Sequence, residues 1–208
     1  MVRIVAGHVK GRRLKSPDGG VRPTTGRVRT SLFDSLSPWI PGRSVLDLCA
    51  GTGSLGIEAL SRGALCAIFV DSDSHATRAI EANLSGIFDT NHVSVWLSDA
   101  IHAIEYLSRN SRSVDLIVAD PPYDTPIPEA IIQSVAASHV LSMDGRLIVE
   151  HSAKIDYSEL DTSMELLRTR KYGNTALSFF RSDTRQDGAV IKPIQPPIDI
   201  PTPRRTRR

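Results

Sequence analysis

Short apolar runs alternate with segments of helical periodicity through the middle of the chain. The apolar runs are typical of buried strands, and they lie at 44–48, 67–70, 93–97, 114–119 and 146–150. Apolar residues recur at helical spacing in the segments between them, which are 54–62, 74–84, 99–108 and 128–138. Strands and helices that alternate in this way predict an α/β fold with a doubly wound, mostly parallel sheet.

Both ends of this alternating region carry extra elements. Two further apolar runs at 164–167 and 177–180 surround a turn signal at Gly173-Asn174, with no helix between them. We therefore expect an antiparallel C-terminal hairpin, which brings the sheet to seven strands. At the other end, residues 2–15 predict a small hairpin, and residues 26–37 predict a helix. The apolar face of that helix consists of Val28, Leu32, Phe33 and Leu36.

Charge divides the chain into three parts. Residues 1–43 hold nine Lys/Arg and two Asp/Glu, a net charge of +7. Residues 44–182 hold ten and eighteen, a net charge of −8, and residues 183–208 hold six and three, a net charge of +3. The last part contains five prolines from residue 191 onward and ends in four arginines within five residues, which predicts a flexible basic tail. An acidic body between a basic arm and a basic tail indicates contact with a polyanion at the ends.

The composition is that of one globular domain with extensions. The chain has 208 residues, of which 40% are hydrophobic, enough to build a core. Its two cysteines, Cys49 and Cys66, lie in apolar surroundings and are expected to be free thiols. No run of about 18 apolar residues is present, and the first residues lack the apolar segment of a signal peptide. We therefore predict a cytoplasmic protein.

A glycine-rich loop follows the first strand of the sheet. Residues 51–56 have the pattern G-x-G-x-x-G, and Asp71 ends the next strand about twenty residues later. Glycines let the backbone approach a ligand, and an acid at this place can accept hydrogen bonds from ribose hydroxyls. Asp47, inside the first strand, is expected to point its charge into the crevice, where it would repel a pyrophosphate. The same charge would attract the α-amino group and sulfonium of S-adenosylmethionine, and Asp99 would suit its adenine amino group. The expected cofactor contacts are Asp47, Ala50, Gly51, Gly53, Asp71, Ser72, Asp99, Ala100 and Asp120.

The fourth strand ends in Asp120-Pro121-Pro122-Tyr123. The two prolines turn the chain stiffly and leave carbonyl oxygens free to accept hydrogen bonds. Asp120 adds a carboxylate acceptor, and Tyr123 adds a flat ring that can stack on a base. Acceptors beside a stacking ring suit a planar heterocycle that carries an exocyclic NH2 group.

These motifs resemble those of class I, Rossmann-like methyltransferases of the amino-methylating type, in which D-P-P-Y is the signature. More narrowly, the chain is similar to the RsmD family, which methylates the guanine N2 amine in small-subunit (16S) ribosomal RNA. The resemblance runs from about residue 2 to residue 182. The segments that carry it are 3–7, 11–12, 22–25, 27–29, 32–33, 46–53, 56–64, 120–123 and 150–151.

The resemblance implies a role for several residues. Asp120 and the Pro121 carbonyl would accept the two N–H bonds of the target amine, and Tyr123 would hold the base after it leaves its stack. Residues 24–29 would close over the cofactor, which adds Thr24 and Arg29 to its contacts. His151 is either a structural hydrogen-bond partner or a substrate contact. The residues expected to be catalytic are Asp120, Pro121, Pro122 and Tyr123, and the expected RNA contacts are Arg12, Arg13, Arg22, Arg27 and Tyr123.

Three other functions stay open at this point. The target amine can be adenine N6 in DNA or a glutamine in a protein. The chain can be an RNA-binding assembly factor without turnover, although the intact Asp120 motif argues against it. It can also be an NAD-dependent oxidoreductase, but no candidate hydride-transfer residue is visible and Asp47 opposes a pyrophosphate. Our prediction is a monomeric methyltransferase that uses S-adenosylmethionine and no metal. Its partner is ribosomal RNA or the small ribosomal subunit, and it has no membrane contact.

Overall fold

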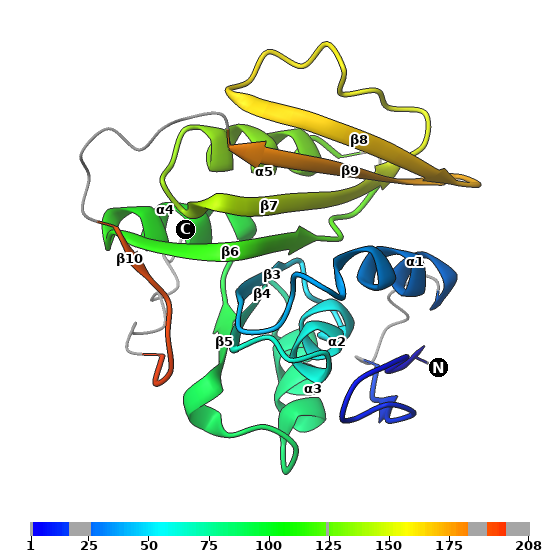
Figure 1. The fold of residues 1–208 in the computed structure, drawn as a ribbon, viewed down its shortest axis with the longest axis vertical. Helices are drawn as coiled ribbons and strands as arrows, with labels where there is room; N and C mark the ends of the chain where they lie inside the picture. The colour runs from blue at the N-terminus through cyan, green and yellow to red at the C-terminus, as the bar shows by residue number, and fades with distance from the viewer. Residues whose placement is uncertain (1, 17–25, 124, 183–190, 199–208) are drawn as a thin grey trace.

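Seven strands of the described residues lie side by side in the order β5-β4-β3-β6-β7-β9-β8 (Figure 1). This computed structural model describes residues 2–16, 26–123, 125–182 and 191–198. The strands are β3 (Ser44–Leu48), β4 (Cys66–Asp71), β5 (Val93–Leu97), β6 (Arg112–Ala119), β7 (Leu141–Ser152), β8 (Met164–Tyr172) and β9 (Thr175–Ser182). Strands β3 to β7 are parallel to one another, and β9 runs antiparallel to both β7 and β8. The predicted doubly wound sheet with a C-terminal antiparallel hairpin is therefore confirmed.

Helices cover both faces of this sheet. They are α1 (Gly26–Leu36), α2 (Ser54–Ser61), α3 (Ser74–Leu84), α4 (Ala100–Arg109) and α5 (Ile127–Ala136). Side chains of α1, α2 and α3 pack into one hydrophobic cluster, and those of α4 and α5 into the cluster on the opposite face. On β6, Leu116 and Val118 face the first cluster while Ile117 and Ala119 face the second. Burial on both faces explains why these strands are continuous apolar runs in the sequence. Within the described parts of the chain, no helix is long and apolar enough to cross a membrane.

The chain reverses its direction of winding between β3 and β6. From β3 it proceeds outward to β4 and β5, and it then returns to place β6 on the other side of β3. The loops after β3 and β6 thus diverge at the carboxyl ends of neighbouring strands. A crevice forms at such a switch point and is where open α/β sheets bind ligands.

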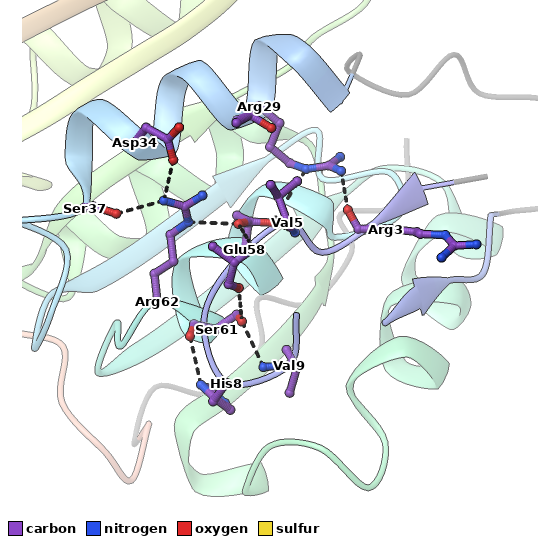
Figure 2. A network of polar contacts seen from close by, with 12 residues as sticks. Arg3, Val5, His8, Val9, Arg29, Asp34, Ser37, Glu58, Ser61 and Arg62 are labelled. Atoms are coloured by element: carbon purple, nitrogen blue, oxygen red, sulfur yellow. Dashed lines mark hydrogen bonds and ion pairs between the residues drawn. The ribbon is translucent and has the colours of Figure 1, made fainter. Parts of the chain in front are cut away.

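The N-terminal arm is fixed to the body by one buried carboxylate, Glu58 of α2 (Figure 2). The arm begins with a hairpin of β1 (Val2–Arg3) and β2 (Arg13–Leu14). Glu58 is 0% exposed, and its oxygens accept hydrogen bonds from the backbone N–H groups of Val5 (2.8 Å) and Ala6 (3.0 Å). The guanidinium of Arg62 donates to the same carboxylate at 2.9 Å, and that of Arg29 lies 3.8 Å away. The negative charge of Glu58 is therefore balanced inside the protein, as a buried charge requires.

A second contact between arm and body depends on Gly7. This glycine has φ of +83°, and a Cβ atom there would lie 1.8 Å from the carbonyl oxygen of Ser61. That carbonyl accepts the backbone N–H of His8 at 2.9 Å, and the Ser61 hydroxyl accepts the N–H of Val9 at 3.1 Å. The close approach holds the arm against the end of α2 (Figure 2). The arm shares a hydrophobic cluster with α1 and α2, so it is packed onto the sheet domain.

The tail prediction is wrong for residues 191–198, which are packed against the body. Strand β10 (Lys192–Pro193) pairs parallel with Arg112 and Ser113, at the start of β6. The pairing of β3 with β6 begins only at Leu116, so the edge of β6 before it is open to another strand. Ile194 is 2% exposed in the core, and the N–H of Ile198 donates to the Asn91 carbonyl. The prediction of a flexible tail was based on its prolines and charge, and it did not consider the apolar residues Ile194 and Ile198. Residues 183–190 and 199–208 lie outside the described residues.

Candidate active site

A cavity of about 780 Å³ opens at the carboxyl ends of the parallel strands. Its size is within the usual range for sites of small molecules and cofactors. The loops after β3, β4, β5 and β6 form its wall, and the cavity-lining residues in these loops lie at 49–52, 71–73, 98–101 and 120–123. Four loops that are distant in the sequence therefore meet at the switch point of the sheet.

The loop after β3 turns through the left-handed region. Cys49, Gly51 and Gly53 have φ of 55°, 56° and 73°. Gly51 lines the cavity, as does Ala50. Gly53 does not line the cavity, contrary to our prediction. A Cβ atom on Gly53 would meet Ile57 and Ile80 at 3.3 Å, so this glycine allows the turn into α2.

Asp71 is fixed by backbone donors on both sides. One carboxylate oxygen accepts the N–H of Gly51 at 2.8 Å, and the other accepts the N–H of Asp73 at 2.9 Å. A carboxylate has about four acceptor positions, so two remain for a ligand. Ser72 and Asp73 line the cavity beside it. Asp71 thus joins the glycine loop to the β4 loop and faces the cavity with a defined orientation.

The position of Asp47 differs from the prediction. Its side chain is 0% exposed and does not line the cavity. One oxygen accepts the N–H of Gly56 at 2.8 Å, and the other has no hydrogen-bond partner among the described residues. Burial raises the pKa of this carboxyl well above its usual value, and Asp120 and Asp71 raise it further. Asp47 is therefore a buried acceptor for a backbone N–H of α2, and it does not line the cavity.

Asp99 begins α4 at the wall of the cavity. Its carboxylate accepts the N–H of His102 at 2.9 Å and so caps the helix. Asp99 is exposed, and both Asp99 and Ala100 line the cavity. The predicted contact residues after β5 are thus brought to the same space as Asp71.

The Asp120 loop forms the opposite wall. Asp120, Pro121, Pro122 and Tyr123 all line the cavity, and the Asp120 N–H donates to the carbonyl of Leu48 at 3.3 Å. The Pro122 carbonyl accepts the Thr125 hydroxyl at 2.8 Å. No described residue donates a hydrogen bond to the Pro121 carbonyl. Pro121 therefore offers the acceptor that the sequence predicted, next to the Asp120 carboxylate.

Two partners that the sequence analysis did not assign hold Tyr123 in place. Its hydroxyl donates to Glu150 at 2.6 Å and lies 2.7 Å from the hydroxyl of Thr175. Glu150 and Thr175 both line the cavity, so β7 and β9 contribute to the site. Burial raises the pKa of Tyr123, and the bond to Glu150 raises it further, so the phenol stays protonated. The motif at 150–151 carried the resemblance, but its first residue was given no role.

His151 is a structural residue. It is 0% exposed and lies outside the residues that line the cavity. Its ring nitrogens lie 2.9 Å from the Ser152 carbonyl and 2.8 Å from the Ser178 hydroxyl. Burial lowers its pKa, so the ring is neutral near pH 7. The structure therefore favours the hydrogen-bond role that the sequence left open.

Cys49 is a neutral residue of the cavity wall. Burial raises the pKa of its thiol to about 12, and the surrounding aspartates act in the same direction. Only the thiolate is strongly nucleophilic. Covalent chemistry by Cys49 is therefore disfavoured at neutral pH.

The predicted basic contacts have different locations. Arg29 is wrong as a cofactor contact, because its side chain is buried among Glu58 and the arm (Figure 2). Its guanidinium donates to the carbonyl of Arg3, and burial lowers its pKa. Arg12, Arg13 and Arg27 are exposed on the arm and α1. Thr24 and Arg22 lie outside the described residues.

Comparisons with known proteins agree with this geometry. The family model described as conserved hypothetical protein 95 matches residues 2–181. The chain belongs to this family. It is 34% identical over 181 residues to the "Putative rRNA methyltransferase YlbH" of Bacillus subtilis, which covers 86% of this chain and 98% of that protein. It is 29% identical over 185 residues to the "Ribosomal RNA small subunit methyltransferase D" of Escherichia coli, covering 88% of this chain and 91% of that protein.

Solved structures give the same relationship. The "Putative methyltransferase yhhF" of Escherichia coli has a TM-score of 0.74 and 28% identity, covering 88% of this chain and 99% of that one. A hypothetical protein of Thermus thermophilus has a TM-score of 0.75 and 27% identity, covering 87% of this chain and 99% of that one. The predicted Rossmann-like methyltransferase fold and the resemblance to the RsmD family are therefore confirmed.

Proposed function

We propose that this chain transfers a methyl group from S-adenosylmethionine to the exocyclic N2 amine of a guanine in small-subunit (16S) ribosomal RNA. The observation that carries the proposal is the Asp120 loop, which forms one wall of an acidic cavity at the switch point of a methyltransferase sheet. Relatives named as ribosomal RNA methyltransferases, which match most of the chain, support RNA as the substrate class. Digestion of the methylated RNA into nucleosides tests the assignment, and N2-methylguanosine is the expected product.

The chemistry of the cavity wall fits S-adenosylmethionine. The wall carries five carboxylates, which are Asp71, Asp73, Asp99, Asp120 and Glu150. Such a wall repels phosphates and attracts a ligand with a sulfonium and an amino group. In our proposal, Asp71 accepts hydrogen bonds from the ribose hydroxyls and Asp99 from the adenine amino group. Ala50, Gly51, Ser72 and Ala100 contribute backbone and surface to the same site. When bound, the cofactor supplies a methyl group on a positively charged sulfur.

The Asp120 loop orients the amine. The lone pair of an exocyclic amine is delocalised into the purine, so the amine is a weak nucleophile. We infer that the Asp120 carboxylate and the Pro121 carbonyl accept its two N–H bonds and turn the lone pair toward the methyl group. Tyr123 presents its ring to the base, and Glu150 and Thr175 fix that ring by its hydroxyl. Positioning of this kind supplies most of the catalysis, because the methyl donor is already activated.

The same proposal assigns RNA contacts to the basic residues of the N-terminal arm and α1. Arg12 and Arg13 in the arm, with Arg22 and Arg27, contact RNA phosphates, and the exposure of the described three leaves them accessible. The chain acts as a cytoplasmic monomer on ribosomal RNA or on the small subunit. Methylation of adenine N6 or of a protein glutamine is the alternative that the cavity alone permits. The family relationship and the five carboxylates disfavour an NAD-dependent oxidoreductase, whose pyrophosphate would meet negative charge.

Replacement of Asp71 by alanine is expected to weaken S-adenosylmethionine binding by about 1–3 kcal/mol, the usual effect of leaving polar groups unpaired. Isothermal titration calorimetry measures this, and NAD should give no binding to the wild type. Asp89→Ala is a matched control, because Asp89 is an exposed aspartate that caps the turn before β5. Wild-type affinity in a folded Asp71→Ala variant would remove Asp71 from the cofactor site.

A further inference from the structure

Two arginines of β8 lie over one aromatic ring of β9. The guanidinium carbons of Arg168 and Arg170 are 4.4 Å and 5.9 Å from the centre of the Phe179 ring. Phe179 itself is 3% exposed and belongs to the core beneath α1. A guanidinium within about 6 Å of a ring centre is attracted to the face of the ring. The guanidinium groups of both arginines therefore pack on a buried ring of the sheet.

Two more arginines repeat this arrangement at Trp39, beyond the end of α1. Arg146 of β7 and Arg43 before β3 lie 4.5 Å and 4.8 Å from the centre of the Trp39 ring. We call Arg43, Arg146, Arg168 and Arg170 the arginine row. Four guanidinium groups thus lie over two rings, along the side of the sheet that α1 covers.

The members of the row are close enough to repel one another. Burial lowers the pKa of Arg168, and the charges of Arg170 and Arg146 lower it further. Burial also lowers the pKa of Arg146, and Arg43 adds to the effect. The charges of the two pairs therefore act on one another across the sheet, and we refer to the row as a positive strip. An anion bound along the strip would relieve this repulsion.

Few carboxylates within the protein neutralise the strip. Arg43 pairs with Asp115 at 3.4 Å. In the part of the chain that the structure describes, no ion pair joins Arg146, Arg168 or Arg170 to a carboxylate. On the same hairpin, Arg181 is paired with Glu165. Arg146, Arg168 and Arg170 are therefore positive charges on this side of the sheet that no described carboxylate balances by an ion pair.

A surface groove runs along α1 beside Arg170, which is the one member of the row that lines it. The lining residues of α1 lie between Gly26 and Ser35, and the volume of the groove is about 540 Å³. Arg27, Thr30 and Ser31 are among them, and the hydroxyl of Ser35 accepts from Arg168 at 3.5 Å. The one carboxylate that lines the groove among the described residues, Asp34, pairs with Arg62 at 3.0 Å. The groove is thus polar and positive, which suits a phosphate chain.

A series of contacts at the β8–β9 turn joins the lining of the groove to the wall of the cavity. Tyr172 at the end of β8 contacts Ser31 of α1, with 2.7 Å between their hydroxyls. Across the hairpin, Tyr172 pairs with Thr175, whose hydroxyl contacts Tyr123. Arg170 is two residues from Tyr172, so the strip begins beside the wall of the cavity and runs away from it along α1.

We propose that the arginine row binds the phosphate backbone of the substrate RNA next to the methylated base, in the groove between α1 and β8. This inference rests on the proposed function and adds a second RNA-binding surface to the N-terminal arm. Arginine is well suited to the task, because its planar guanidinium binds phosphate oxygens in pairs. The aromatic rings hold the guanidinium groups in place before RNA arrives, so fewer rotamers are lost on binding.

The double variant Arg168→Gln with Arg170→Gln tests the proposal. Binding to a small-subunit ribosomal RNA transcript is measured at several salt concentrations. Each phosphate contact contributes about 0.7–0.9 to the slope of log affinity against log salt. We expect the double variant to lose about 1.4–1.8 of this slope and to bind at least about tenfold more weakly near physiological salt. Arg109→Gln on α4 is the control, because it removes one exposed charge on the opposite helical layer.

The possible outcomes distinguish failure of the RNA-binding proposal for the arginine row from failure of the proposed methyltransferase function. If the double variant keeps the wild-type slope and affinity while the wild type methylates the RNA, the arginine row is not an RNA surface but the proposed function stands. If the wild type neither binds nor methylates the RNA, the proposed function fails. Calorimetry with S-adenosylmethionine should give equal affinities for wild type and double variant, and a loss here would indicate misfolding. In that event the single variant Arg146→Gln, which leaves the β8–β9 hairpin unchanged, takes its place. It is expected to lose about 0.7–0.9 of the salt slope, the contribution of one phosphate contact. An unchanged slope in this variant would overturn the proposal.

Discussion

Replacement of Asp120 by alanine is expected to lower the rate of methyl transfer by at least about a hundredfold, while S-adenosylmethionine binds nearly as before. The reason is geometric, because Asp120 and the Pro121 carbonyl stand side by side at the cavity as the two proposed acceptors for the amine. Without the carboxylate, the amine loses one of its two orienting bonds, and well-oriented reactants account for a large part of such rate enhancements. Single-turnover transfer of a labelled methyl group to RNA measures the effect.

Asp120→Asn is the matched control for this experiment. The amide keeps the size of the side chain and one carbonyl oxygen that can accept a hydrogen bond, but it lacks the charge. We expect its rate to lie between those of wild type and Asp120→Ala. A near wild-type rate in a folded Asp120→Ala variant would mean that the motif is only a turn in this protein.

Replacement of Glu58 by alanine is expected to lower the free energy of unfolding by about 3–5 kcal/mol, as happens when one partner of a buried ion pair is removed. The Arg29 side chain, which is 3% exposed, would lose its carboxylate partner, and two backbone N–H groups of the arm would lose their acceptor. Denaturation by urea, followed by circular dichroism, measures the change.

The chain contains a suitable control in Glu105→Ala. Glu105 also lies on a helix and also pairs with an arginine four residues later, Arg109, but its side chain is 47% exposed. An exposed pair of this kind contributes about 0.3–0.5 kcal/mol. Equal losses in the two variants would contradict the view that Glu58 fixes the arm to the body.

The alternation of strands and helices could be predicted because the parallel strands are buried on both faces. Burial on both faces leaves a continuous apolar run, which stands out against the periodic helices. The prediction for β7 was less complete, since the strand begins at Leu141 and not at residue 146. Ser142, Asp144 and Gly145 interrupt the apolar run, and pairing of Leu141 with Val114 of β6 determines the earlier start. Pairing of this kind depends on tertiary structure and leaves no local signal.

Site residues could be predicted where they directly follow a parallel strand. They could not be predicted where a side chain can point either into the cavity or into the core. Asp71, Asp99 and Asp120 line the cavity because carboxyl ends of parallel strands meet at one edge. Asp47 lies in the same region of its strand, but the N–H of Gly56 binds it beneath the loop. Arg29 likewise has a partner, Glu58, on a helix that is distant in the sequence. Sequence spacing could not decide either direction.

The basic surface shows a further limit of reading charge along the sequence. Net charge pointed to the arm at 1–43 and described residues 44–182 as acidic. The sheet nevertheless brings Arg146 of β7 near enough to Arg168 of β8 to lower the pKa of Arg168, although β9 lies between these strands. Trp39 and Phe179, which support the row, are ordinary apolar positions in the sequence. Counting the net charge of each sequence segment therefore cannot detect charges that only the folded sheet brings together.

Nucleoside analysis of the reaction product tests the central claim most directly. The purified chain is incubated with labelled S-adenosylmethionine and with small-subunit ribosomal RNA from a strain that lacks this chain, either naked or as assembled subunits. The RNA is then digested and separated. We predict that the label is in N2-methylguanosine and that RNA from a strain with the chain accepts none. Label in N6-methyladenosine, or no label in RNA under either condition, would contradict the account.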